Sequence, residues 1–387
     1  MVALKSLSVA GYRSIRDLTI PLGPVNIITG ANGTGKSNLY QSLVLVSQAA
    51  SGRFARAIAE EGGMPSILWA GGERHRSTRK KPPKRCRLSI ETDDFAFGFS
   101  AGLPKPGALA TLFTHDPEVK DERISLSIAG RRVVVMERTG PSAWLRNNDG
   151  AMETYPLGIA PDESVLSQVV EPHRYPEVSM ARQAILRWRF SHQFRTDPSS
   201  PMRTPQFGMR TNVLSKDGLD LAAALETIRE VGHVELLDET IARAFHGASI
   251  EIGASGAMFD LSLRVPGLLR ALSVRELSDG QLRFLCLTAA LLSPRPPDLI
   301  ALNEPETSLH PELYQPLAGL IAEASATSQI WVTTHAQPLA DAISSSARVD
   351  PIKLELIEGE TRIAGDPNSP RRPHQWLHFT DDGDDTD

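Results

Sequence analysis

The sequence predicts an α/β protein with a mixed sheet, an antiparallel β subdomain and an inserted helical lobe. Three observations lead to this prediction. An apolar run at 25–29 ends in a glycine-rich turn, and helical periodicity begins directly after it. Apolar and polar residues alternate from about 87 to 146, whereas 162–246 is mostly periodic in the way that helices are. Beyond residue 280, helices and strands alternate in a βαβ-like series.

The length and composition are those of a folded protein with several parts. At 387 residues the chain is longer than one ordinary domain, and 41% apolar with 22% charged residues is an average globular composition. The net charge of −5 means that any nucleic-acid site must be local. We expect four parts: an N-terminal lobe at 1–150, a helical insertion at 151–270, a C-terminal lobe at 271–365 and an acidic tail at 366–387.

The cysteine content and the lengths of the apolar segments indicate in which cellular compartment the protein is expected. Cys86 and Cys286 are the two cysteines, too few for a disulfide framework or a cysteine-based zinc site, and this usage fits a reducing environment. The N-terminus lacks the apolar core of a secretory signal, and the apolar stretch 284–292 is about half as long as a bilayer crossing requires. We therefore expect a cytoplasmic protein that does not engage a membrane.

A glycine-rich loop lies between the third expected strand and the first helix. Strands are expected at 4–10, 18–22 and 25–29, and a helix from Lys36 to about residue 51. The loop matches G-x-x-x-x-G-K-[ST] and consists of Gly30, Ala31, Asn32, Gly33, Thr34, Gly35, Lys36 and Ser37. Such a loop surrounds a triphosphate with backbone N–H groups, while its lysine reaches the outer phosphates and its serine hydroxyl binds Mg²⁺. The sequence therefore predicts a site for ATP and Mg²⁺.

A second polar cluster follows the apolar strand expected at 299–302. Asn303 and Glu304 come directly after it, where an open α/β sheet presents side chains to a ligand. Glu304 is the candidate base for an attacking water, and Asn303 is the candidate magnesium ligand. An amide oxygen brings no charge, so we expect Asn303 to hold Mg²⁺ more weakly than an aspartate would and turnover to be slow.

Three short motifs surround this strand. The segment 277–281, LSDGQ, opens a helix for which Ser278 is a natural N-cap. The segment SLHP at 308–311 follows Glu304, and His335 follows the next strand, expected at 329–334. Together with the glycine-rich loop they form an ordered series of motifs.

In these motifs the sequence resembles the ABC-type ATPases of the RecF, SMC and OLD-like branch, without a long coiled coil or a nuclease domain. The resemblance implies a P-loop NTPase fold of the ABC-ATPase type and Mg²⁺-dependent ATP hydrolysis, with His335 as the switch histidine. It also implies that the signature residues Ser278, Gly280 and Gln281 of one subunit contact the ATP held by another. The resulting assembly is an ATP-dependent, head-to-tail homodimer.

Two further family residues are matched less closely. The Q-loop glutamine, which senses Mg²⁺ and the nucleophile, is best matched by Gln168, although a glutamine on a surface helix is the alternative. Arg13 resembles the N-terminal arginine that approaches the nucleotide in the RecF and SMC branch, and an exposed loop arginine is the alternative there. Both roles are implied by the resemblance alone.

A basic segment precedes the expected antiparallel strands. It contains Arg79, Lys80, Lys81, Lys84 and Arg85, in a chain that is acidic as a whole. Such a cluster can neutralise phosphates of DNA or RNA and release counterions, or it can be a solvated loop. Because aromatic residues are not interleaved with it, we expect any binding to be to the nucleic-acid backbone.

These features favour an ATPase that acts by ATP-dependent dimerisation in DNA maintenance, DNA repair or phage defence. One alternative is a slow nucleotide-dependent scaffold for a separate effector protein, which the uncharged Asn303 favours. Another alternative is a transporter motor subunit. The long segment between the P-loop and Gln168 argues against it, because this interval is much shorter in transporter motors. Fold analogy alone does not decide among these functions.

Overall fold

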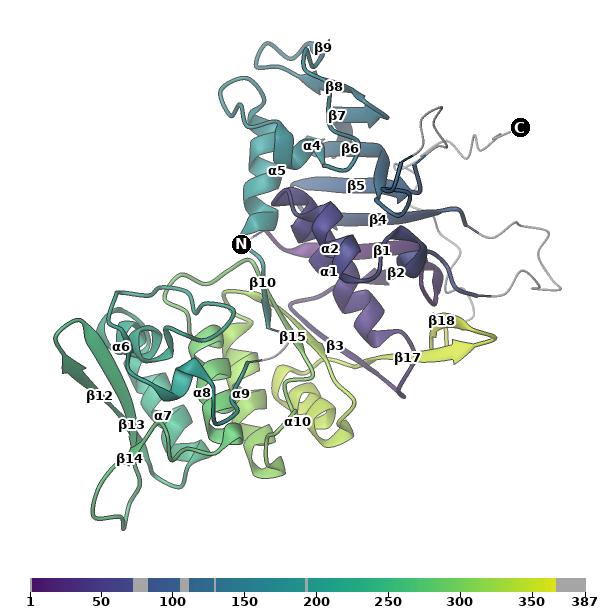
Figure 1. Ribbon diagram of the computed structural model, residues 1–387. Helices are drawn as coiled ribbons and strands as arrows, with labels where there is room; N and C mark the ends of the chain where they lie inside the picture. Colours follow the sequence, from purple (N-terminus) through teal and green to yellow (C-terminus); the bar gives the residue numbers. More distant parts are fainter. Residues whose placement is uncertain (1, 72–82, 105–110, 129, 192–193, 367–387) are drawn as a thin grey trace. The chain divides into compact units, whose positions relative to one another are not determined.

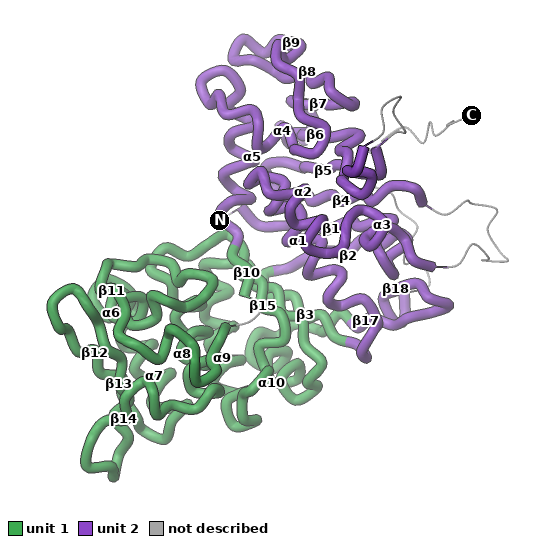
Figure 2. The backbone as a smooth tube through the Cα atoms, viewed as in Figure 1, with its two compact units in different colours: residues 1, 24–29, 189–352 green, residues 2–23, 30–188, 353–387 purple. Residues whose placement is uncertain are grey.

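The structure is a computed structural model that describes residues 2–71, 83–104, 111–128, 130–191 and 194–366. These residues form two compact units, which Figure 2 shows in green and purple. The first unit contains 24–29 and 189–352, and the second contains 2–23, 30–188 and the chain from 353 onward. Among the described residues, no helix has the length and apolar character that a membrane span requires.

An eight-stranded antiparallel sheet forms the centre of the second unit (Figure 1). Its order is β2-β1-β4-β5-β6-β7-β8-β9. The strands are β1 (Leu4–Tyr12), β2 (Ile15–Pro21), β4 (Arg85–Thr92), β5 (Phe95–Gly102), β6 (Glu118–Ile128), β7 (Arg131–Thr139), β8 (Ser142–Arg146) and β9 (Met152–Thr154). Phe97 pairs with Ile90 on one side and Ile124 on the other, so buried apolar side chains line up across the strands. The antiparallel subdomain predicted from period-two alternation is thus confirmed.

Helices accompany this sheet in the second unit. They are α1 (Lys36–Ala50), α2 (Phe54–Glu60), α3 (Met64–Ile67), α4 (Val165–Gln168) and α5 (Pro176–Leu186), and a hairpin of β17 (Ile352–Ile357) and β18 (Glu360–Ile363) follows them in the chain. Helix α1 contacts β1 and β4 of the sheet. Its buried side chains include Leu39, Leu43 and Val46, the residues whose helical spacing predicts this element.

A parallel sheet forms the centre of the first unit. Its strands, in order, are β10 (Arg189–Ser191), β15 (Leu299–Asn303), β16 (Gln329–Thr333) and β3 (Val25–Gly30). All three pairings are parallel, so the carboxyl ends of the strands lie at one edge. Asn303 pairs with Thr333, and Thr333 pairs with Ile28, which aligns the ends of β15, β16 and β3.

Helices and a small antiparallel sheet complete the first unit. The helices are α6 (Leu221–Val231), α7 (Val234–Ala244), α8 (Asp279–Leu291), α9 (Tyr314–Ala324) and α10 (Gln337–Ala347), with 3₁₀ turns η1 (Pro201–Arg203) and η2 (Pro311–Leu313). The small sheet contains β11 (Gln206–Phe207), β12 (Ser249–Ser255), β13 (Met258–Arg264) and β14 (Leu272–Ser273). Buried side chains of β15, β16, α8 and α9 share one apolar core. Residues 311–324 begin as the 3₁₀ turn η2 and continue as α9, and the βαβ-like series predicted beyond residue 280 is confirmed.

Candidate active site

The P-loop is closed around the side chain of Lys36. The lysine Nζ donates hydrogen bonds to the carbonyl oxygens of Gly30 at 2.8 Å and of Ala31 at 2.9 Å, and Thr34 Oγ1 donates to Ala31 O at 2.8 Å. Helix α1 follows Gly35, which has no side chain to cap the first turn, so the N-terminal backbone N–H groups face the loop. A buried ammonium beside an uncapped helix N-terminus is a site for an anion such as a triphosphate.

Two glycines of the P-loop are required because other parts of the chain approach their Cα atoms closely. Gly35 has a φ of 98°, and a Cβ atom there would lie 2.2 Å from the hydroxyl oxygen of Thr361 in β18. A Cβ atom at Gly30 would lie 2.6 Å from the carbonyl oxygen of Leu354 in β17. Larger side chains would push the β17–β18 hairpin away from the P-loop. Ser37, by contrast, is exposed in the first turn of α1, where its hydroxyl can reach a metal ion.

Arg13 lies near the first turn of α1. Its guanidinium forms an ion pair with Glu61 at 2.5 Å and donates a hydrogen bond to Asn38 Oδ1 at 3.5 Å. Asn38 in turn donates to Ser14 Oγ at 2.9 Å, and Ser14 bonds with Thr361 at 2.8 Å. The structure therefore brings Arg13 to Asn38, the residue that follows Ser37, and the approach of this arginine to a nucleotide stays a prediction.

Gln168 lies away from the P-loop. Its neighbour Ser167 packs near Gly52, beyond the C-terminal end of α1, whereas the P-loop precedes the N-terminal end. A helix of 15 residues separates its ends by about 22 Å. Gln168 Oε1 accepts a hydrogen bond from the Ala160 N–H at 3.0 Å, so this side chain fixes the preceding loop. The arrangement corrects the expected role of Gln168 as Q-loop residue and magnesium ligand.

Gln193 is a second candidate for a sensing glutamine, judged from its place in the sequence. Strand β10 runs parallel to β15, and Ser191 pairs with Leu302, so β10 ends at the edge where Asn303 and Glu304 lie. Gln193 follows β10 in the sequence but lies outside the described residues. The signal is a polar residue after a short strand, and it is hard to recognise because the strand has three residues, of which only Phe190 is apolar.

Glu304 occupies a strained backbone position directly after β15. Its φ is 48°, an uncommon conformation for a residue with a side chain, and its N–H donates to Thr333 O at 2.7 Å. Arg283 of α8 donates to the carbonyl oxygens of Glu304 at 2.9 Å and of Pro305 at 3.3 Å. Burial lowers the pKa of the Arg283 guanidinium, and the nearby Glu306 carboxylate opposes that shift. These contacts hold the turn that presents the Glu304 carboxylate.

Glu304 and His335 lie together at the carboxyl edge of the parallel sheet. His335 Nδ1 is 3.9 Å from Glu304 Oε1, and it is 3.1 Å from Oε1 of a second carboxylate, Glu306. The side chains of Glu304 and His335 are partly exposed, whereas that of Glu306 is only 3% exposed. From the sequence, Glu304 and His335 are named separately, but Glu306 is given no role, because a second glutamate in a turn has no distinctive spacing.

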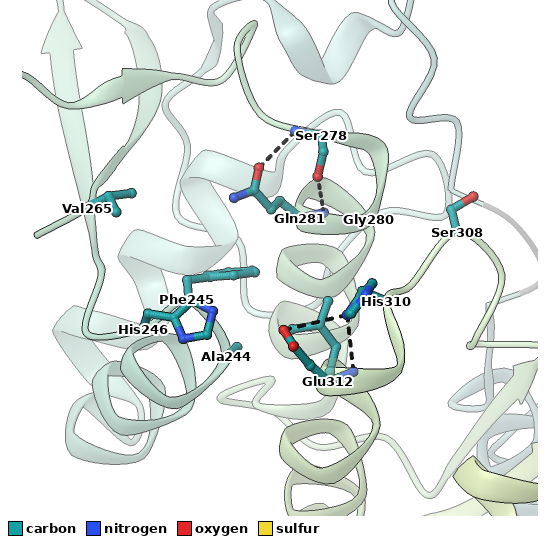
Figure 3. Close-up of a pocket in the computed structure, with 11 residues that line it drawn as sticks. Ala244, Phe245, His246, Val265, Ser278, Gly280, Gln281, Ser308, His310 and Glu312 are labelled. Carbon is teal, nitrogen blue, oxygen red and sulfur yellow. Dashed lines mark hydrogen bonds and ion pairs between the residues drawn. The ribbon is translucent and has the colours of Figure 1, made fainter. Parts of the chain in front are cut away.

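The signature residues begin helix α8 as predicted. Ser278 is its N-cap: Ser278 Oγ accepts from the Gln281 N–H at 3.2 Å, and Gln281 Oε1 accepts from the Ser278 N–H at 2.9 Å, as Figure 3 shows. A Cβ atom at Gly280 would lie 2.5 Å from the carbonyl oxygen of Ser308. Gly280 therefore allows the signature helix to touch the loop that follows Glu304.

A cavity of about 350 Å³ opens beside the signature residues (Figure 3). Its polar lining includes Ser278, Gln281 and His310, and its apolar lining includes Phe245 and Val265. All of these residues belong to the first unit. The exposed signature surface is thus hollow, so a group presented by a second molecule has room to enter.

The structure describes only part of the basic segment. Arg79, Lys80 and Lys81 lie outside the described residues. Lys84 is exposed, whereas Arg85 begins β4 and pairs with Asp121 at 2.9 Å. The positive charge of Arg85 is therefore largely balanced within the protein.

Comparisons with known proteins agree with this fold. Residues 160–341 match a family described as an AAA domain, putative AbiEii toxin, type IV TA system, and residues 6–134 match another AAA domain. An SMC head bound to the C-winged helix domain of ScpA is 15% identical, with a TM-score of 0.52 over 93% of this chain and 97% of that chain. The SMC head domain from Thermotoga maritima is also 15% identical over the same shares, with a TM-score of 0.45. None of the curated proteins matches the sequence.

The chain thus has the fold of the SMC head domains, and two of its segments match AAA-domain families. These matches agree with the resemblance to the ABC-type, SMC-like ATPases. The fold class predicted from the sequence is confirmed.

Replacing Lys36 with alanine should weaken ATP binding at least about a hundredfold, because a strong charge-assisted contact to the phosphates is lost. Isothermal titration calorimetry measures the affinity. Lys5→Ala, which removes an exposed ammonium paired with Asp93, is the control and should bind ATP as the parent does. Undiminished affinity of the Lys36→Ala variant would show that ATP does not bind in the P-loop.

Proposed function

We propose that this protein binds Mg²⁺-ATP in the P-loop and hydrolyses it with Glu304 as the base that orients and deprotonates the attacking water. The observation that carries the proposal is the meeting of Glu304 and His335 at the carboxyl edge of a parallel sheet whose strand β3 runs directly into the P-loop. The partly exposed Glu304 carboxylate can reach a water, and the strained turn fixes its direction. His335 lies beside it to contact the nucleotide.

The residues present fit a magnesium ion that is bound mainly through the nucleotide. Ser37 in the second unit and Asn303 in the first each carry a side-chain oxygen of the kind that Mg²⁺ prefers, and Asn303 contributes no charge. No group of three or more histidine, cysteine, aspartate or glutamate side chains within the described ranges forms a metal site by itself. When bound, Mg²⁺ neutralises charge that develops on the phosphates. A weakly held metal favours slow turnover and a long-lived ATP-bound state.

The signature surface supports a role in ATP-dependent dimerisation. Ser278, Gly280 and Gln281 line a cavity on the first unit (Figure 3), and Ser278 is exposed. We propose that this surface contacts the ATP held in the P-loop of a second copy, which gives a head-to-tail homodimer. DNA maintenance, DNA repair or phage defence, with or without a separate effector protein, is the setting proposed for this ATP-gated switch.

Glu304→Gln should bind ATP with parent affinity but hydrolyse it at least about tenfold more slowly, because the amide cannot accept the proton of water. The phosphate release rate and the molar mass from light scattering are measured at saturating Mg²⁺-ATP. The variant is expected to accumulate as a dimer. Glu323→Gln, an exposed change on α9, is the control. Hydrolysis at the parent rate would contradict the role of Glu304, and a monomer would contradict the dimer.

Nucleic-acid binding is a second candidate function, favoured by the density of cations in the basic segment. Replacing Arg79, Lys80, Lys81, Lys84 and Arg85 with serine should weaken binding to duplex DNA and flatten its dependence on salt. Fluorescence anisotropy at several salt concentrations measures both. Because Arg85 is paired with Asp121, restoring Arg85 alone should recover little affinity. If the parent protein does not bind DNA or RNA at low salt, the segment is a solvated loop.

A further inference from the structure

Glu306 is a buried carboxylate in the turn that follows the catalytic strand. One of its oxygens, Oε1, accepts hydrogen bonds from the Thr334 hydroxyl at 2.7 Å, the His335 N–H at 2.9 Å and the Ala336 N–H at 3.3 Å. His335 Nδ1 lies 3.1 Å from the same oxygen. Three consecutive residues of the switch segment are thus held by one oxygen atom of a side chain that is 3% exposed.

The turn around Glu306 is itself held on both sides. Its carbonyl oxygen accepts from the Leu309 N–H at 2.9 Å, and the Thr307 N–H donates to Glu304 O at 3.2 Å. Arg283 holds the two residues before Glu306 through their carbonyl oxygens. Burying a carboxylate is costly unless hydrogen bonds compensate it, so the position of Glu306 is well defined by its partners.

The two carboxylates beside His335 differ in what they can do. Glu304 is 3.9 Å from the ring and 38% exposed, so its side chain can still reach a water. Glu306 is closer, buried and already hydrogen-bonded to the backbone of the histidine. A second histidine–glutamate pair in the chain, His310 and Glu312, is 3.6 Å apart but about 70% exposed, and no comparable network surrounds it in the described residues.

We propose that Glu306 is the positioning residue of His335. It fixes the backbone of the switch segment and turns the ring so that the proton sits on Nδ1 and points to the carboxylate. Nε2 is then the ring atom left for the nucleotide or its attacking water, and Glu304 is left for the water itself. This inference rests on the proposed ATP hydrolysis, and it adds Glu306 to the residues of the proposed site.

The kinetic test is a double-mutant cycle with Glu306→Gln and His335→Ala. Glu306→Gln keeps the size of the side chain and should lower kcat at least about tenfold, with little change in KM, because a wrongly oriented ring acts only in the transition state. In the His335→Ala background the same change should have almost no further effect. Glu323→Gln is the control for loss of one negative charge, and thermal unfolding checks that each variant is folded. Independent, multiplicative losses would overturn the proposal.

The spectroscopic test does not require ATPase activity. Ring ¹⁵N chemical shifts of the nucleotide-free protein report which nitrogen of His335 is protonated, with His335→Gln used to assign the signal. The expected result is an Nδ1–H ring in the parent and in Glu323→Gln, and a shift toward the Nε2–H form in Glu306→Ala or Glu306→Gln. An Nε2–H ring in the parent, or no change in the folded variants, would overturn the proposal. If the tautomer follows Glu306 but the parent does not hydrolyse ATP, the proposed function fails while the positioning role remains.

Discussion

The site depends on the parallel pairing of β15, β16 and β3. Their register sets Asn303 beside Thr333 and Thr333 beside Ile28, and the Thr334 N–H extends the pairing with a hydrogen bond to Ile28 O at 3.0 Å. Parallel strands end at the same edge, so the residues after β15 and β16 must meet there. A shift of one residue would move the buried side chains of a strand to its opposite face, and the apolar core resists this.

The loop after β15 connects this edge to the signature helix. Gly280 of α8 touches Ser308, Arg283 of α8 holds the carbonyl oxygens of Glu304 and Pro305, and Glu306 holds the switch segment. A group that binds at the start of α8 would therefore act on the same short loop that presents Glu304. These contacts offer a physical basis for coupling between the proposed dimerisation and the proposed hydrolysis, because a displacement of α8 would act on the Glu304 turn directly.

The sequence predicts the structural elements that are determined by residues close together in the chain. The strands, the glycine-rich loop and the Ser278 cap depend on residues close together in the chain. Each is present in the structure, although β1 ends two residues later than expected and β2 begins three residues earlier. Gln168 could not be placed in this way, since its position depends on the packing of α4 at the far end of α1. The role of Glu306 could not be predicted from the sequence for a similar reason. Its partners are nearly thirty positions further along the chain, and burial alone distinguishes it from the other glutamates of the turn.

The central proposal is that the ATP-binding site in the P-loop of one copy is completed by the signature residues of another copy. Amide hydrogen exchange with a non-hydrolysable ATP analogue and Mg²⁺, at low and high protein concentration, tests it most directly. We expect residues 30–37 to become protected at both concentrations and residues 278–281 to become protected only at the higher one, where dimers form. Protection of the signature at a concentration where the protein is monomeric, or no protection of the P-loop at all, would contradict the account.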